Sequence, residues 1–173
     1  SQCEADESLL QIIPYVAVVC GDYVMVYTRG TAGEPRLNAK QSIGFGGHLN
    51  DGDKSYLDGL CREGREELIG FLPGATTAPI GFIYDDSNPV GRVHLGVFHA
   101  YAFTDCPVVP AEVHSHRWAK IEHIIPSETV ETWSRIAAIM LMECSLDDQD
   151  SDRQATRKPD EAAVAPDCGS VGR

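Results

Sequence analysis

The chain has 173 residues, 43% of them hydrophobic, which is enough for one globular domain with its own core. The formal net charge of −12 disfavours general nucleic-acid binding, because an acidic protein repels the phosphate backbone. No stretch approaches the roughly 20 consecutive apolar residues of a membrane-spanning helix, so a membrane is not expected as a partner either.

The first part of the chain predicts a hairpin, a loop and a short strand. Two runs rich in β-branched residues, 12–19 and 23–28, flank a Gly-Asp turn, as in a β-hairpin. Glycine, proline and polar residues predict a loop over 30–40. A short strand is predicted over 42–45.

Residues 55–69 are predicted to form a helix. Ser55 and Asp58 have the spacing of a capping box, with Asp in place of the usual Glu or Gln. Gly70 supplies a C-terminal stop. Residues three and four apart form the stripe expected to be buried: Leu57, Leu60, Cys61, Gly64 and Leu68.

The second part of the chain predicts two strands and a last helix. The strands are expected over 78–84 and 92–103, with turn-forming residues between them, and a loop over 108–118 leads into another short strand. An apolar stripe predicts a helix over 127–144. Trp118 is expected in the core, as is the tryptophan of that helix, Trp133.

These elements predict one α/β domain with a mixed sheet between helices. The domain is expected over residues 10–144, after a flexible start over 1–9. Residues 145–173 are rich in Asp, Ala and Pro and hold no aromatic residue, so a disordered acidic tail is expected there.

The six cysteines form neither a C-x-x-C pair nor a repeated spacing. This pattern argues against a zinc site and against a disulfide framework. A chain of this size does not need cross-links to fold. We therefore expect no disulfide framework and a reducing, cytoplasmic setting.

Glu63, Glu66 and Glu67 carry the clearest sign of chemistry. At positions i, i+3 and i+4 of the predicted helix they share one face, where their charges repel. A divalent cation relieves that repulsion, and oxygen ligands suit Mg²⁺ or Mn²⁺. The alternative is a solvated acidic face paired with Arg62 and Arg65 within the helix.

The residues upstream favour the metal site over the solvated face. Gly46, Gly47 and His48 precede the helix, and glycine allows the backbone to approach a ligand closely. A free carbonyl there, as at Gly46, could be a further metal ligand.

This segment resembles the signature of the Nudix hydrolase family, G-x5-E-x7-R-E-U-x-E-E-x-G-U, where U is a bulky apolar residue. Gly47 matches the opening glycine, and Asp53 stands where the family has Glu. Arg62-Glu63 matches the R-E pair, and Glu66-Glu67 matches the E-E pair. Three departures are an extra residue before the arginine (attributed to Lys54), Gly64 at the apolar position, and a closing Gly70 one residue late.

The resemblance implies a Nudix-like α/β/α sandwich over roughly residues 10–144. It implies Mg²⁺ or Mn²⁺ held by Glu63, Glu66 and Glu67 together with Gly46, and a structural brace from Asp53 to Arg62. It assigns catalysis to Glu66, Glu67 and Arg62.

The resemblance also implies a reaction. The expected reaction is hydrolysis of a diphosphate linkage in a nucleoside triphosphate, or in a nucleoside diphosphate linked to another group. A catalytically weak ligand-binding or regulatory domain is the first alternative. Diphosphate isomerisation and a purely structural domain are the others, and a homodimer is left open.

Side chains outside the signature are candidates for substrate contact and proton transfer. Arginine and lysine suit phosphate contact. Surface solubility is the favoured alternative for Arg36 and Lys40, and a structural role is the equal alternative for Arg92 and His94. In the loop before Trp118, Glu112 is the candidate for an additional catalytic acid, and His114 and His116 are alternative bases. The candidates for substrate binding are Arg36, Lys40, Arg92 and His94.

Overall fold

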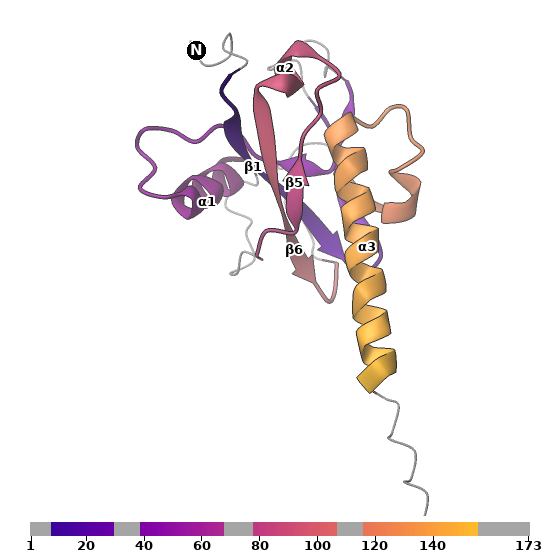
Figure 1. The fold of residues 1–173 in the computed structure, drawn as a ribbon. Coiled ribbons are helices and arrows are strands. Elements are labelled where there is room, and N and C mark those ends of the chain that lie inside the picture. The colour runs from indigo at the N-terminus through magenta and orange to yellow at the C-terminus, as the bar shows by residue number, and fades with distance from the viewer. Residues whose placement is uncertain (1–7, 30–38, 68–77, 107–115, 156–173) are drawn as a thin grey trace, which may run out of the picture. The chain divides into compact units, whose positions relative to one another are not determined.

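The structure is a computed structural model that describes residues 8–29, 39–67, 78–106 and 116–155, the last ten as helical backbone alone. These residues form a seven-stranded mixed sheet and its helices (Figure 1). The main strand order is β3-β2-β1-β6-β5, and β4 and β7 pair with β1 and β2. The strands are β1 (Gln11–Cys20), β2 (Tyr23–Thr28), β3 (Gln41–Ser42), β4 (Gly44–Phe45), β5 (Gly81–Ile83), β6 (His94–Phe103) and β7 (His116–Lys120).

The predicted hairpin is present, and β1 lies at the centre of the sheet. β1 and β2 are antiparallel, with Val19 opposite Val24. Along its other edge β1 pairs with β6 in parallel over its whole length. The run 12–19 is almost wholly apolar because β1 has a strand neighbour on both edges and a helix against each face.

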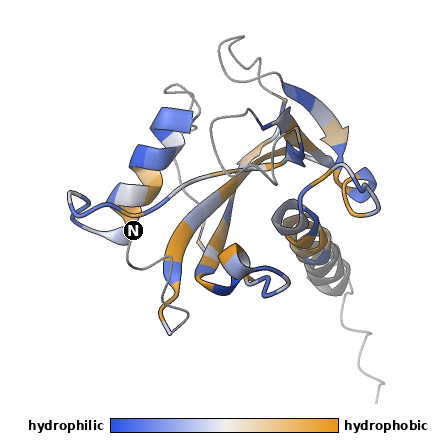
Figure 2. Cartoon of the chain, turned by 90° about the horizontal axis from the view of Figure 1, so that it is seen from above, coloured by the Kyte–Doolittle hydropathy of each residue, from blue (hydrophilic) through white to orange (hydrophobic). Residues whose placement is uncertain are grey.

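The two long helices cover opposite faces of the sheet, since alternate residues of a strand point to opposite sides. Tyr15 and Ala17 of β1 belong to a core cluster with Ala137 of α3 (Thr132–Ala155). Val16, between them, packs with Leu60 of α1 (Tyr56–Glu67). The sheet therefore lies between α1 and α3, as Figures 1 and 2 show, and the predicted α/β/α arrangement is confirmed.

The helix α1 begins as predicted. The backbone N–H of Asp58 donates to the Ser55 hydroxyl at 3.2 Å, which is the expected cap. Leu60 is fully buried, but Leu57 is 56% exposed, so its place in the predicted buried stripe is wrong. The stripe is narrower because α1 meets the sheet along one edge, with Gly59 and Gly64 also buried there. Leu68 and Gly70 lie outside the described residues.

The predicted turn between β5 and β6 contains a short helix, α2 (Pro89–Arg92). The Asn88 side chain caps it by accepting from the Gly91 N–H at 2.9 Å. Proline at the first helical position has no N–H to leave unpaired, which favours this start. The next strand accordingly begins at His94 and not at residue 92.

The last helix differs from its predicted bounds at both ends. α3 begins at Thr132 because residues 127–131 form turns and a bridge to Gln41 instead. It continues to Ala155, whereas the sequence predicted a disordered tail from residue 145, and residues 156–173 lie outside the described residues. No helix among the described residues is long and apolar enough to cross a membrane.

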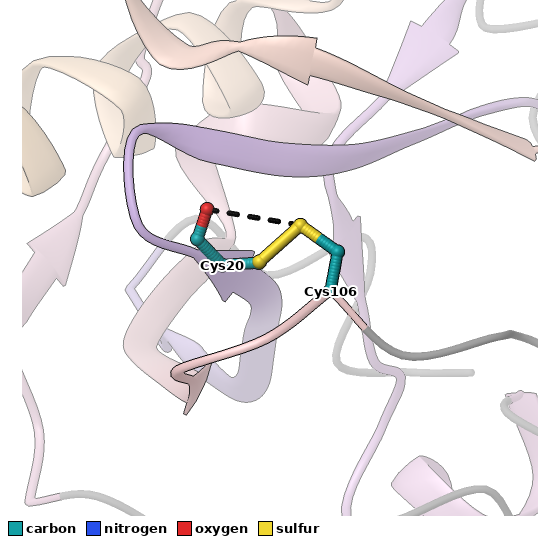
Figure 3. The surroundings of a disulfide bond; sticks show 2 residues. All are labelled: Cys20 and Cys106. Atoms are coloured by element: carbon teal, nitrogen blue, oxygen red, sulfur yellow. Dashed lines mark hydrogen bonds between the residues drawn. A yellow bond between two sulfur atoms is a disulfide. The ribbon is translucent and has the colours of Figure 1, made fainter.

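A disulfide joins Cys20 to Cys106, although the cysteine pattern suggested no disulfide framework (Figure 3). The sequence spacing of 86 residues gave no hint of it. The parallel pairing places Cys20, at the end of β1, opposite Phe103 of β6, which brings Cys106 within bonding distance. Cys61 and Cys144 are free thiols.

Reduction of this disulfide should lower the free energy of unfolding by about 2–4 kcal/mol, because the bond closes a long loop in the unfolded chain. Urea unfolding with and without reductant measures the change. The double variant Cys20→Ser/Cys106→Ser should be insensitive to reductant. The matched control Cys61→Ser should keep the full sensitivity of the natural chain. Equal stability of the natural chain in both conditions would contradict this.

Candidate active site

Arg62 connects the loop before α1 to the acidic face of that helix. Its Nε and Nη2 atoms donate to the two Asp53 carboxylate oxygens, both at 3.0 Å. Its Nη1 atom donates to Glu63 at 2.7 Å and to Glu66 at 3.1 Å. Nη2 also donates to the His48 carbonyl at 2.9 Å. One guanidinium thus fixes the glycine-rich segment, the loop and two of the three candidate metal ligands relative to one another.

The shorter Asp53 side chain reaches Arg62 in spite of the extra residue in this loop. The Asn50 backbone N–H donates to the same carboxylate at 2.7 Å. Hydrogen bonds from Arg62 and from Asn50 lower the pKa of Asp53 to about 2. The pKa of Arg62 is raised in turn by Asp53 and Glu63. Both partners therefore carry their charges throughout the neutral pH range.

Asp53→Asn should lower stability at neutral pH, and the loss should disappear in acid. The folded pKa of Asp53, about 2, lies below its unfolded value of about 3.9. The stabilisation is therefore present above about pH 4 and is lost as the pH falls towards 2. Urea unfolding of both proteins between pH 2 and pH 7 measures the difference. A difference that does not depend on pH would contradict the role of the charge.

Gly46 and Gly47 bring the backbone against the Glu63 carboxylate. A Cβ atom at Gly47 would lie 2.5 Å from Oε2 of Glu63, so a larger residue does not fit there. Gly46 has φ of +154°, and a Cβ atom at this position would overlap the Pro14 carbonyl oxygen. Gly46 therefore requires glycine, whereas a Cβ atom at Gly47 would displace the Glu63 carboxylate from its present position. Glu63 thus has one oxygen on Arg62 and the other beside the glycine backbone.

The three predicted ligands differ in their surroundings. Glu63 is buried, Glu66 has a side chain that is 61% exposed, and Glu67 is half-buried. In the part of the chain that the structure describes, no three His, Cys, Asp or Glu side chains form a group that could hold a metal ion. Arg62 forms ion pairs with both Glu63 and Glu66.

A cavity of about 630 Å³ opens beside the glycines. This volume is typical of a small-molecule site. Apolar side chains, a few charged side chains and two histidines line the cavity. Lining residues from the described part of the chain include Tyr15, Arg29, Gly46, Gly47, Asp85, His94, Glu131 and Trp133.

Among the predicted substrate contacts, His94 lies in this cavity. Its Nε2 atom is 3.0 Å from Nε2 of His48, and its Nδ1 atom is 2.6 Å from the Val90 carbonyl oxygen. Nδ1 therefore donates to the carbonyl, Nε2 of a neutral His94 accepts, and His48 donates. The histidine pair fixes the cavity wall between the glycine segment and α2.

The other predicted contacts lie elsewhere or outside the described residues. Lys40 donates to the Glu128 carbonyl at 2.9 Å and does not line the cavity. Arg92 ends α2 and is likewise absent from the lining. His116 lies on β7, opposite Tyr27. Arg36, Glu112 and His114 fall outside the described residues.

Arg29 and Glu131 were not predicted from the sequence, although both line the cavity. Arg29 directly follows β2 and leads into a glycine-containing loop. A cation at such a position could have been predicted as a ligand contact. Glu131 precedes α3 and had no such signal. Its role depends on partners from β1 and β3, which are far away in the sequence.

Known proteins with a similar sequence or fold identify the family of this chain. No protein-family model matches the chain. Protein YmaB of Bacillus subtilis (strain 168) is 34% identical over 152 residues, which cover 80% of this chain and 74% of YmaB. The crystal structure of Tm1382, a protein assigned to the Nudix hydrolases, matches with a TM-score of 0.59 and 29% identity, over 83% of this chain and 76% of Tm1382. The chain belongs to the Nudix hydrolase family.

More distant Nudix structures share the fold. The MutT protein of Methanosarcina mazei Go1 is 16% identical, with a TM-score of 0.58 over 86% of this chain and 97% of that protein. A bifunctional NMN adenylyltransferase/ADP-ribose pyrophosphatase of Francisella tularensis is 19% identical, with a TM-score of 0.54. That match covers 78% of this chain but 42% of the bifunctional enzyme. The Nudix fold of this chain therefore corresponds to one part of the larger protein.

Proposed function

We propose that this Nudix protein is a metal-dependent hydrolase that cleaves a diphosphate linkage. The substrate class is a nucleoside triphosphate or a nucleoside diphosphate linked to another group. The observation that carries the proposal is the Asp53–Arg62–Glu63 arrangement, which holds a carboxylate against the Gly46-Gly47 backbone beside a cavity of about 630 Å³.

The donor atoms fit Mg²⁺ or Mn²⁺. The candidate ligands are the carboxylates of Glu63, Glu66 and Glu67 and the Gly46 carbonyl, all of which are oxygen donors. The close approach of Glu63 to Gly47 brings a carboxylate and a backbone segment together, and this approach requires glycine.

A bound divalent cation would supply Lewis-acid stabilisation of charge on phosphoryl oxygens and lower the pKa of a water molecule. The residues of the chain position that chemistry. Asp53 holds Arg62 through two hydrogen bonds, and Arg62 holds Glu63 and Glu66 through one nitrogen. His48 and His94 shape the cavity that receives the substrate.

A catalytically weak ligand-binding domain is the second candidate. The observation that favours it is that Arg62 already neutralises Glu63 and Glu66, and that the described residues include no preformed group of three metal-binding side chains. A domain of this kind would bind a nucleotide in the cavity and turn it over slowly or not at all.

A screen of diphosphate compounds separates the two candidates. The hydrolase should release phosphate or nucleotide from at least one compound with Mg²⁺ or Mn²⁺, and EDTA should abolish the release. A binding domain should show ligand-induced thermal stabilisation without release. If neither release nor metal-induced stabilisation is seen, the proposed function is wrong.

We propose a cytoplasmic location and a homodimer as the sequence suggests. The Cys20–Cys106 disulfide argues against the cytoplasm, because disulfides are rare in its reducing conditions. Thiol alkylation of the protein in its native cell, followed by mass spectrometry, determines whether the bond is present there.

A further inference from the structure

Arg29 lies in the wall of the cavity that also contains Gly46 and Gly47. Of the described residues that line the cavity, it is the one Lys or Arg. Its backbone N–H donates to the Lys40 carbonyl at 2.9 Å, so the sheet fixes the start of the side chain. The side chain is 34% exposed. A cation is thus held in the wall of a cavity that is also lined by Gly47, the residue beside the Glu63 carboxylate.

Glu131 contacts the Arg29 guanidinium from the interior of the protein. Its side chain is 5% exposed, and its Oε2 atom lies 3.4 Å from Nη1 of Arg29. Its Oε1 atom accepts from three buried hydroxyl groups. The donors are Tyr15 at 3.1 Å, Ser42 at 2.5 Å and Ser134 at 3.1 Å. A buried carboxylate with this many donors is held in one position.

Tyr15 and Arg29, the two ends of this network, both stay protonated. Burial raises the pKa of Tyr15, and the charge of Glu131 raises it further, so the phenol remains a donor. Burial by itself lowers the pKa of Arg29, but Tyr27 and Glu131 raise it and the net shift is upward. Glu67 contributes to this rise, which places Arg29 within the electrostatic reach of the candidate metal ligands.

The guanidinium has donors left for another anion. Glu131 engages one nitrogen, at a distance longer than the roughly 2.7–2.9 Å of a tight charge-assisted hydrogen bond. Within the part of the chain that the structure describes, the side chain of Arg29 has no second hydrogen-bond partner. An arginine has five N–H donors in a planar fork, which suits two oxygens of one phosphate.

We propose that Arg29 binds a phosphate group of the substrate and that Glu131 is the positioning residue that holds it. The proposal rests on the proposed function, because it assumes a diphosphate at the candidate metal site. The diphosphate would lie between the carboxylates of α1 and the guanidinium of Arg29. Lys40 and Arg92, which the sequence suggested for phosphate contact, do not line this cavity.

The test uses methylenediphosphonate, a diphosphate analogue whose P–C–P bridge is not hydrolysed. Isothermal titration calorimetry with Mg²⁺ should show that Arg29→Met weakens binding at least tenfold, which is about 1.4 kcal/mol. Arg29→Lys should recover part of the affinity, because it keeps the charge but not the fork. The matched control is Arg117→Met, which removes an exposed arginine of β7 outside the cavity and should bind as the natural chain does.

Glu131→Gln tests the positioning role. It should raise KM for the best substrate more than it lowers kcat, because the cation remains but is less well placed. If this variant does not fold, the two Arg29 variants still decide on the contact. Equal binding by the natural chain and Arg29→Met would overturn the proposal, as would no binding by the natural chain. An inactive natural chain that binds the analogue through Arg29 would contradict only the proposed hydrolysis.

Discussion

Glu66→Gln and Glu67→Gln should each lower the rate of diphosphate hydrolysis in Mg²⁺ by orders of magnitude. Each substitution keeps the shape of the side chain but removes one negative charge from the candidate metal site. A bound cation contributes several kcal/mol of transition-state stabilisation, and each 1.36 kcal/mol corresponds to a tenfold change in rate. Steady-state kinetics on the best compound from the diphosphate screen measures the loss.

Folding should change little in these variants. The Arg62–Glu66 pair is exposed on the Glu66 side, and such pairs contribute about 0–1 kcal/mol. Removing a like charge from the crowded face also relieves repulsion. The thermal shift that Mg²⁺ induces should shrink in both variants, since a ligand stabilises the folded state according to its affinity.

The matched control is Glu143→Gln, which removes the same charge from an exposed position on α3. It should keep both the natural rate and the natural response to Mg²⁺. Near-natural rates in both site variants would show that α1 is not the catalytic element.

Gly46→Ala should destabilise the fold by about 2–4 kcal/mol and abolish most activity. The φ angle of +154° is strained for any residue with a Cβ atom, at a cost of about 1–3 kcal/mol. The new atom would also overlap the Pro14 carbonyl oxygen, which belongs to the central strand β1 and cannot easily move. The resulting backbone shift would displace the Gly46 carbonyl from the candidate metal site. Urea unfolding and the hydrolysis assay measure the two effects.

Gly52→Ala is the control for this prediction. Gly52 lies in the exposed loop before α1, and a Cβ atom there would meet nothing within 4 Å. Its substitution should change stability by less than about 0.5 kcal/mol, as is usual for surface positions. Equal stability of the two variants would mean that Gly46 does not need its glycine conformation.

The sequence by itself determined the parts of the molecule that are local in the chain. The apolar, β-branched content of 12–19 and 23–28 and the Gly-Asp turn between them predicted the hairpin, because β-branched residues favour strands and glycine favours turns. The Ser55 cap and the helical spacing of Glu63, Glu66 and Glu67 predicted α1 and its acidic face. Those features belonged to single elements, where near neighbours in sequence are also neighbours in space.

The tertiary structure decided which distant residues meet. Parallel pairing of β1 with β6 brought Cys20 to Cys106, and no spacing rule in the sequence predicts such a pair. The exposure of Leu57 depended on how much of α1 meets the sheet, which helical periodicity does not specify.

The cavity is the clearest case of a feature that only the tertiary structure could define. Glu131 precedes α3, Tyr15 lies on β1, and Arg29 follows β2, yet one network of buried hydrogen bonds unites them. A buried carboxylate is stable only where several donors converge on it, and convergence is a property of the packed sheet and helices. The sequence therefore indicated the helix that carries the candidate metal ligands, whereas packing around β1 determined which cation faces the cavity.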